Sequence, residues 1–215
     1  MKYKYILFDL DGTLTDPGVG ITKAVQYALK KNNIIEESLS ALEIFIGPPL
    51  KDSFVEFYSF DEKMVSDSIQ YFREYFIKNG IFENEVYSGI LDLLRELKNG
   101  DCKIAVATSK PTVFANTVLK HFGMMEYFDL VVGSNLDGTL GNKAEIINCV
   151  IENLKIKNLK ETIMIGDRKY DVIGAEKNNI DSVGVLYGYG SLEELEEASP
   201  TYIVDSISQL HKLLT

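Results

Sequence analysis

The sequence predicts an α/β fold in which helices cover a parallel sheet and a small helical domain is inserted after the first strand. From Tyr87 onward, apolar runs of strand length alternate with helical patterns, as they do in parallel sheets. Between the first apolar run, residues 4–8, and Tyr87 the pattern is mostly helical, so it interrupts this alternation. Polar side chains follow directly after several of the predicted strands.

The first predicted strand, residues 4–8, is rich in Ile, Phe and Tyr, which is typical of a buried central strand. It ends in two carboxylates, Asp9 and Asp11, separated by one residue. Residues i and i+2 of an extended segment point the same way, so both carboxylates can share one site. Gly12 lets the backbone turn sharply beside them. This arrangement suits a metal ion and an anion together.

Residues 16–87 are predicted to form the inserted helical domain, and residues 1–15 and 88–215 the α/β core domain. Residues 20–32 and 65–76 carry apolar side chains at the spacing of a helix face. The aromatic side chains of the insert are expected to form its core, because a small helical domain needs large side chains. They include Phe54, Phe57, Tyr58, Phe60, Tyr71, Tyr75 and Phe82.

After Tyr87 the alternation resumes and completes the predicted sheet. Strands are expected at residues 103–108, 128–133, 162–166, 182–186 and 202–204, and helices at residues 90–97, 112–122 and from about 143. Parallel sheets of this kind bind ligands outside the carboxyl ends of their strands. The polar residues that follow the predicted strands therefore mark the expected site.

Four short motifs occur in order at or beyond these strand ends. They are Asp9-Leu10-Asp11-Gly12-Thr13, Thr108-Ser109, Lys143, and Asp167 with Asp171 four residues later. Together they resemble the signatures of the haloacid dehalogenase superfamily, and the resemblance covers nearly the whole chain. It implies a Rossmann-like parallel-sheet core with an inserted helical cap, and a phosphatase that hydrolyses phosphate monoesters through an aspartyl-phosphate.

The resemblance also implies the roles of the individual residues. Asp9 would be the nucleophile and Asp11 the acid/base. The groups expected to bind the phosphoryl oxygens are Gly12, Thr108, Ser109 and Lys143. One difference is Ala144, where many relatives have proline after the lysine. Taken singly, Thr108 could be a strand-end cap and Lys143 a surface lysine at a helix start.

The cofactor that the resemblance implies is Mg²⁺. Its expected oxygen ligands are Asp9, the backbone carbonyl of Asp11, and Asp167, while Asp171 supports the site from the far side. Mn²⁺ would fit the same ligands. Taken singly, Asp167 and Asp171 could also be no more than a helix N-terminus.

A second copy of the Leu-Asp-Gly-Thr-Leu pentapeptide occurs at residues 136–140. It is preceded by Asn135 at the position that Asp9 holds in the first copy, and an amide cannot serve as a carboxylate nucleophile. We interpret this copy as a loop after a strand.

The identity of the substrate is suggested by longer segments. The motif around Asp9, the Ile46-Gly47-Pro48-Pro49-Leu50 segment, residues 106–111 and residues 184–190 resemble the phosphoglycolate phosphatase-like branch, and within it proteins described as 5'-nucleotidases. We therefore expect nucleoside 5'-monophosphates as substrates, with phosphoglycolate as the alternative. A sugar phosphomutase and a catalytically silent regulatory protein are further alternatives.

In relatives of this kind the cap supplies residues that select the substrate, and Gly47, Pro48 and Lys51 are the candidates here. Pro48 and Pro49 lack amide donors and must break the helix, so the alternative is that this segment only ends one cap helix and starts the next.

Composition limits the partners of the protein. The formal net charge is −10, which argues against nucleic acid as a partner, because binding phosphate polymers requires a clustered basic face. No apolar run approaches the roughly 20 residues of a membrane span, and the start of the chain lacks the layout of a signal peptide. The two cysteines are too few for a disulfide framework. We expect a cytoplasmic monomer or homodimer that acts on a small-molecule phosphate ester.

Overall fold

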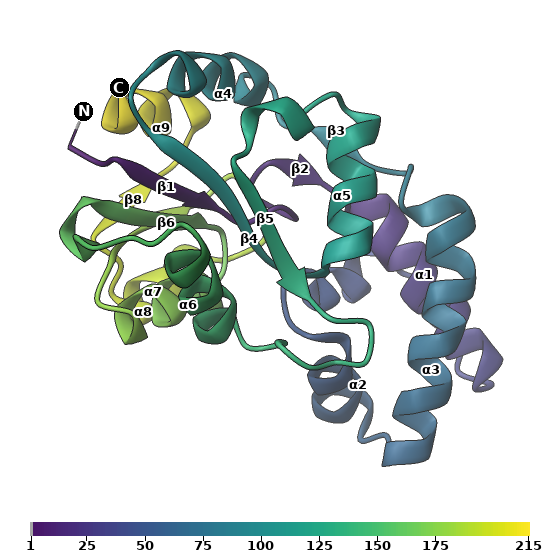
Figure 1. Cartoon of the computed structure of the whole chain (residues 1–215). Helices are drawn as coiled ribbons and strands as arrows, with labels where there is room; N and C mark the ends of the chain where they lie inside the picture. The colour runs from purple at the N-terminus through teal and green to yellow at the C-terminus, as the bar shows by residue number, and fades with distance from the viewer. Residues whose placement is uncertain (1) are drawn as a thin grey trace. The chain divides into compact units, whose positions relative to one another are not determined.

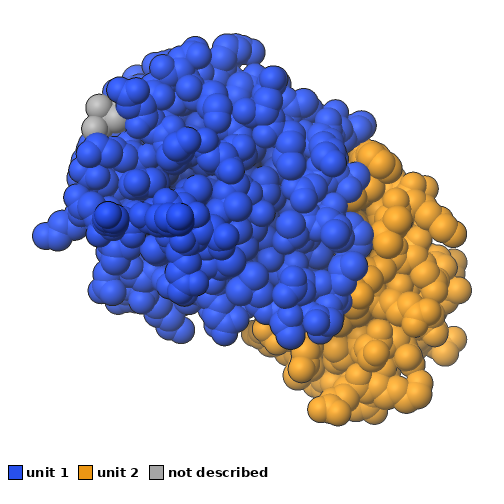
Figure 2. Space-filling view, viewed as in Figure 1, with its two compact units in different colours: residues 1–16, 86–215 blue, residues 17–85 orange. Residues whose placement is uncertain are grey.

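The computed structural model describes residues 2–215 and divides the chain into two compact units. Unit 1 contains Met1–Asp16 and Val86–Thr215, and unit 2 contains Pro17–Glu85; Figure 2 shows them in different colours. Each unit has its own buried apolar side chains. None of the helices in the described part of the chain is both long and apolar enough to cross a membrane.

Unit 1 is built on a six-stranded sheet in which every neighbouring pair of strands is parallel (Figure 1). The strand order is β5-β4-β1-β6-β7-β8. The strands are β1 (Tyr5–Phe8), β4 (Lys103–Pro111), β5 (Leu130–Ser134), β6 (Thr162–Gly166), β7 (Asp181–Val185) and β8 (Tyr202–Val204). The predicted α/β fold with a Rossmann-like parallel sheet is confirmed.

Helices cover both faces of this sheet (Figure 1). They are α4 (Ile90–Asn99), α5 (Thr112–His121), α6 (Lys143–Asn153), α7 (Lys169–Lys177), α8 (Leu192–Ala198) and α9 (Ile207–Leu214), with the short 3₁₀ helices η3 (Met125–Tyr127) and η4 (Leu159–Glu161). Leu7 of β1 packs in one core cluster with Ile147 of α6. Ile6 and Phe8 are fully buried as well and point to the opposite face, because side chains alternate along a strand. A strand buried on both faces explains the continuous apolar run in the sequence.

The register of the sheet sets where the polar residues lie. Phe8, the last residue of β1, is level with Val106 of β4 and Ile165 of β6. The residues that follow these three positions therefore lie at the same edge of the sheet. A separate two-stranded sheet is formed by β2 (Thr15–Asp16) and β3 (Glu85–Val86).

Strand β4 differs from its prediction at its carboxyl end. The expected strand stopped at Thr108, whereas β4 continues to Pro111. Thr108 pairs with Gly133 and Pro111 pairs with Ser134, so the register shifts and two extra residues, Ser109 and Lys110, are accommodated in β4. Bulges of this kind bend a strand and aim its side chains, and they occur often beside active sites.

Unit 2 consists of helices packed around aromatic side chains. Its elements are α1 (Gly18–Lys31), the 3₁₀ helix η1 (Ser40–Phe45), α2 (Leu50–Tyr58), α3 (Glu62–Tyr75) and the π-helix η2 (Phe76–Gly80). Phe54 and Phe60 are buried and their rings stack, as expected for core residues. The core prediction is wrong for Phe57 and Phe82, whose side chains are exposed.

Two glycines allow a close contact inside unit 2. A Cβ atom on Gly20 of α1 would overlap the carbonyl oxygen of Gly80, and a Cβ atom on Gly80 would come within 2.7 Å of the carbonyl oxygen of Gly20. The amide of Gly20 also donates to the carbonyl of Glu83 at 3.1 Å. The backbones of α1 and η2 thus touch directly, which only glycine permits.

We expect Gly20→Ala to lower the free energy of unfolding by about 1–3 kcal/mol, because the new methyl group must displace backbone atoms. Urea unfolding followed by circular dichroism measures this change. The exposed neighbour Val19→Ala is the matched control and should stay within about 0.5 kcal/mol of the wild type. Equal stability of Gly20→Ala and the control would show that the close contact is not required.

Candidate active site

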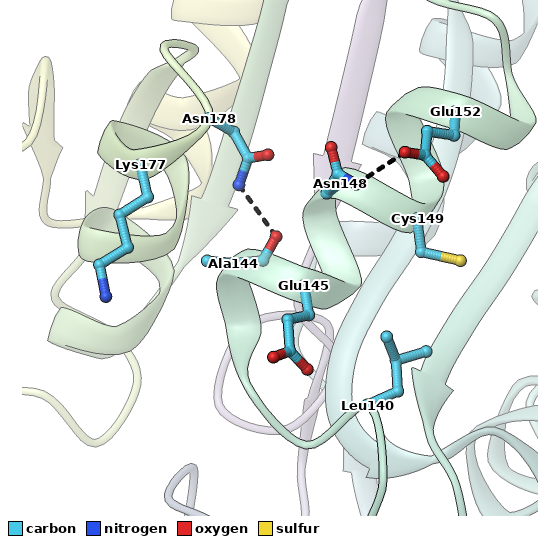
Figure 3. A pocket seen from close by; sticks show the side chains of 8 residues that line it. All are labelled: Leu140, Ala144, Glu145, Asn148, Cys149, Glu152, Lys177 and Asn178. Atoms are coloured by element: carbon cyan, nitrogen blue, oxygen red, sulfur yellow. Dashed lines mark hydrogen bonds between the residues drawn. The ribbon is translucent and has the colours of Figure 1, made fainter.

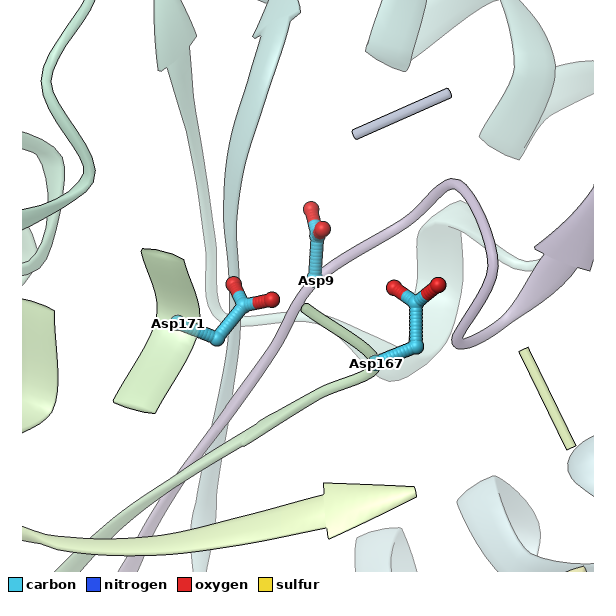
Figure 4. Close-up of side chains that lie close together, drawn as sticks. All are labelled: Asp9, Asp167 and Asp171. Carbon is cyan, nitrogen blue, oxygen red and sulfur yellow. The ribbon is translucent and has the colours of Figure 1, made fainter. Parts of the chain in front are cut away.

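Three buried carboxylates lie together at the carboxyl edge of the sheet. Asp9 follows β1, Asp167 follows β6, and Asp171 lies in the first turn of α7. One oxygen from each lies within 4.8 Å of the others, and all three side chains are buried (Figure 4). Figure 4 shows that the three carboxylates come from separate segments of unit 1. The sequence prediction placed these residues at one edge, and the structure brings them into one cluster.

Lys143, the first residue of α6, points its ammonium group into this cluster. Its Nζ lies 3.0 Å from Oδ1 of Asp9 and 2.7 Å from Oδ1 of Asp171, and it donates to the carbonyl of Ala107 at 3.1 Å. Burial alone would lower the pKa of Lys143, but the charges of Asp171 and Asp9 outweigh it and raise that pKa above its ordinary value. Lys143 is therefore a fixed positive charge beside Asp9.

Asp9 is oriented through one of its two oxygens. Oδ1 accepts a hydrogen bond from the amide of Leu10 at 2.8 Å and also receives the ammonium of Lys143. These contacts, both to Oδ1, hold the carboxylate in one orientation and leave Oδ2 available for a further partner.

Asp11 is paired with a lysine that was not among the predicted site residues. Lys110, at the bulge of β4, is buried and forms an ion pair with Oδ2 of Asp11. Burial raises the pKa of Asp11, and the charge of Lys110 opposes that rise. The available signal was spacing: Lys110 is two residues after Thr108, so in an extended segment both side chains point to the same side.

Thr108 and Ser109 lie near the carboxyl end of β4, at the edge of the sheet that carries the carboxylate cluster. Thr108 is buried, and its Oγ1 accepts from the amide of Lys110 at 3.3 Å. The carbonyl of Ser109 accepts from the hydroxyl of Ser134 at 2.8 Å. These bonds fix the bulged backbone between the two strands.

Asp167 is enclosed by glycines from two loops. The amide of Tyr189 donates to its Oδ2 at 2.8 Å. A Cβ atom on Gly12, whose φ is +82°, would overlap the Asp167 carboxylate, and a Cβ atom on Gly188 would overlap Asp167 and the carbonyl of Gly12. The amide of Gly12 itself donates to the carbonyl of Thr15 at 2.8 Å. In the sequence, residues 184–190 carry a resemblance to phosphoglycolate phosphatase-like proteins but no pattern that indicates this packing on Asp167.

The donor set fits a divalent metal ion. The four buried carboxylates Asp9, Asp11, Asp167 and Asp171 face two buried ammonium groups, those of Lys110 and Lys143, which leaves a formal excess of two negative charges. Burial, together with the charges of Asp171 and Asp9, raises the pKa of Asp167 well above its ordinary value. One divalent cation would balance this charge, and carboxylate oxygens are the ligands that Mg²⁺ prefers.

The predicted cap residues lie in unit 2. Gly47 has a φ of +101°, Pro48 follows it, and Lys51 is an exposed residue in the first turn of α2. Gly47 thus occupies a backbone conformation that favours glycine. Their role in selecting the substrate stays a prediction.

A groove of about 550 Å³ lies elsewhere on unit 1, on the outer side of α6 and the end of α7 (Figure 3). Glu145, Asn148 and Cys149 line it from α6, and Asn178 closes it by donating to the carbonyl of Ala144 at 2.9 Å. None of the residues of the carboxylate cluster lines this groove. We therefore assign the chemistry to the cluster and not to the groove.

The second Leu-Asp-Gly-Thr-Leu copy is a loop after β5, as interpreted from the sequence. The amide of Asn135 donates to the carbonyl of Thr139 at 2.9 Å, and the carboxylate of Asp137 accepts from Thr139 within the same loop. Asp137 is exposed, in contrast to the buried Asp11.

Comparison with known proteins identifies the family. The sequence model of the haloacid dehalogenase-like hydrolases matches residues 6–185. The chain is 42% identical over 214 residues to a 5'-nucleotidase of Pseudomonas aeruginosa, covering 100% of this chain and 96% of that protein. It is 28% identical over 215 residues to a phosphoglycolate phosphatase of Colwellia psychrerythraea, covering 95% and 94%.

A solved structure agrees with this assignment. A crystal structure described as a predicted phosphatase from Clostridium acetobutylicum is 55% identical, covers 99% of this chain and 98% of its own, and has a TM-score of 0.96. The fold is thus shared with a protein described as a phosphatase. The chain belongs to the haloacid dehalogenase-like hydrolase family, as the sequence motifs predicted.

We expect Mg²⁺ to raise the melting temperature of the protein, and to raise it more at about pH 8 than at about pH 5. Burial raises the pKa values of Asp11, Asp167 and Asp171 above the ordinary value of 3.8. In the metal-free protein the stability linked to these groups is fully present below their unfolded-state pKa. It is lost as the pH rises through the raised values, where a bound cation would compensate.

Scanning calorimetry with Mg²⁺ or EDTA at both pH values measures this effect. At a hundredfold excess of Mg²⁺ over its Kd the gain is about 2.7 kcal/mol, or about 5–10 °C. Asp167→Asn should lose most of the shift. A shift of equal size in Asp167→Asn would contradict the assigned cation site.

Proposed function

We propose that the protein hydrolyses phosphate monoesters of small molecules through a phosphoryl group carried on Asp9, with nucleoside 5'-monophosphates as preferred substrates. The reaction rests on one observation above all: Lys143 and the amide of Leu10 both hold Oδ1 of Asp9. They orient the carboxylate with Oδ2 available for attack, and the positive charge of Lys143 reduces repulsion between Asp9 and an anionic ester.

In the first step Oδ2 of Asp9 attacks phosphorus, and the bond from phosphorus to the ester oxygen breaks. Asp11 gives a proton to the departing alkoxide, which leaves as an alcohol. Splitting the hydrolysis into two displacements replaces one slow attack by water with two easier steps. Burial of Asp11 favours its protonated form, which this step requires.

In the second step water attacks the phosphoryl group, and the bond between phosphorus and Asp9 breaks. Asp11, now a carboxylate, accepts the proton of that water, which restores the starting state and releases inorganic phosphate. The same side chain serves as acid and then as base, as reversibility requires.

The phosphoryl oxygens need donors and positive charge. We assign this to the hydroxyl of Thr108, the amide of Ser109, the backbone turn at Gly12, and Lys143. We assign Asp9, the backbone carbonyl of Asp11, and Asp167 as the ligands of Mg²⁺. We assign Asp171 the role of orienting Lys143, whose Nζ lies 2.7 Å from Oδ1 of Asp171. When bound, the cation neutralises the charge shared by the carboxylates and the phosphate.

The choice of substrate is supported by the relative named 5'-nucleotidase, which matches the whole chain at 42% identity. Phosphoglycolate is the alternative, supported by the relative named phosphoglycolate phosphatase. Gly47, Pro48 and Lys51 remain the proposed selecting residues. We also propose that the protein is a cytoplasmic monomer or homodimer that binds neither nucleic acid nor membrane. The net charge of −10 argues against nucleic acid as a partner.

Phosphate release with Mg²⁺ tests this function on nucleoside 5'-monophosphates, 2-phosphoglycolate and hexose phosphates, compared by kcat/KM. We expect the highest value for a nucleotide, and a loss of at least about a thousandfold in Asp9→Asn because the nucleophile is gone.

The second pentapeptide provides the matched control. Asp9→Asn makes the first copy identical to the second at the preceding position, where the second copy has Asn135. Asp137→Asn changes only the exposed loop and should keep wild-type activity. Preference for phosphoglycolate would replace the nucleotide assignment. Absence of metal-dependent turnover on every ester, or full activity of Asp9→Asn, would refute the proposed reaction.

A further inference from the structure

Lys110 is a buried cation that the reaction described above does not use. Its side chain is 5% exposed, and its ammonium group contacts Oδ2 of Asp11. Removing a lysine from water is costly unless the charge is paired, so a buried lysine needs a specific partner. Here that partner is the proposed acid/base.

The backbone around Lys110 is built to hold it in this place. The register shift of β4 inserts Ser109 and Lys110 opposite the Gly133–Ser134 step of β5. The hydroxyl of Ser134 donates to the carbonyl of Ser109 at 2.8 Å. A Cβ atom on Gly133 would overlap the carbonyl oxygen of Lys110, so glycine is needed there. The bulge is therefore fixed from the neighbouring strand.

The ion pair makes the two oxygens of Asp11 unequal. Oδ2 is occupied by Lys110, whereas Oδ1 is buried and has no hydrogen-bond partner among the described residues. A buried, unpartnered carboxylate oxygen is costly, and such atoms in native proteins call for a functional explanation.

We propose that Lys110 is a positioning residue, which holds Asp11 by Oδ2 so that Oδ1 exchanges the proton with the ester oxygen. The proposal rests on the proposed hydrolysis and deepens it. The proton passes from Oδ1 of Asp11 to the departing oxygen, and no other atom of Lys110 or Asp11 changes its bonds. Lys143 has a different task, because its contacts are to Asp9, Asp171 and the carbonyl of Ala107.

This role predicts an effect that depends on the leaving group. An alkyl phosphate releases a strongly basic alkoxide, which needs a proton from Asp11, whereas p-nitrophenyl phosphate releases a stable phenolate, which does not. kcat/KM includes only the steps up to the first irreversible one, so it isolates transfer of the phosphoryl group to the enzyme. Lys110→Met should lower kcat/KM about 10–100-fold for the alkyl ester but no more than about threefold for the aryl ester.

The experiment compares adenosine 5'-monophosphate or 2-phosphoglycolate, whichever the wild type hydrolyses faster, with p-nitrophenyl phosphate. Lys110→Arg should restore much of the alkyl activity, since it keeps the cation. Lys103→Met, an exposed lysine of the same strand, is the matched control and should leave both values unchanged. In an Asp11→Asn background, Lys110→Met should cause no further selective loss.

The outcomes separate the two claims. If the wild type hydrolyses no phosphate ester, the proposed function fails. If the wild type is active but Lys110→Met lowers kcat/KM equally for the alkyl and the aryl ester, the positioning role is overturned. It is also overturned if the fall in kcat/KM is matched by an equal rise in the inhibition constant of inorganic phosphate, because Lys110 then binds phosphate. If Lys110→Met does not fold, Lys110→Gln is measured in its place. A ratio of alkyl to aryl kcat/KM that equals the wild-type ratio in Lys110→Gln also overturns the positioning role.

Discussion

Repulsion among buried carboxylates is the constraint on which the core of this protein depends. Four aspartates lie at one edge of the sheet, and their mutual repulsion and burial would expel them from a protein interior. Each is held by compensating contacts: Lys143 binds Asp9 and Asp171, Lys110 binds Asp11, and the amide of Tyr189 binds Asp167. The formal excess of two negative charges that remains fits the proposed divalent cation.

The parallel sheet explains how residues far apart in sequence share this site. β1, β4 and β6 are neighbours in register, with Phe8 level with Val106 and Ile165, so the residues that follow these positions lie at one edge of the sheet. The helices α6 and α7 then start at the same edge and present Lys143 and Asp171 from their first turns. Topology thus concentrates polar groups without placing them in the apolar core.

The sequence was sufficient to predict the elements whose signal is local. The apolar run before Asp9 predicted a central strand, and the spacing of Asp9 and Asp11 predicted a shared site, because both follow from strand periodicity. The order of the four motifs predicted the family. Lys110 was not assigned, because its burial depends on a bulge that is fixed by Gly133 and Ser134 on another strand.

Contacts made by the backbone could not be predicted from the sequence either. The amide of Tyr189 binds Asp167, and Gly188 is required for this approach, yet neither leaves a pattern that identifies its partner. In unit 2, Phe57 and Phe82 are exposed although they are as apolar as the buried Phe54. Phe57 lies on the outer side of α2 and Phe82 in the turn after η2, so position in the fold and not residue type decides burial. Prediction succeeded where periodicity decides the outcome and failed where non-local packing does.

The most direct test of the account is to trap the phosphoryl group on Asp9. In Asp11→Asn with p-nitrophenyl phosphate, the first step needs no acid while the second lacks its base, so the phosphorylated protein should accumulate. Acid quenching, digestion and mass spectrometry should then find phosphate on the peptide that contains Asp9, and borohydride should reduce this residue to homoserine. Phosphate on a different residue, or none while nitrophenolate is released, would contradict the account.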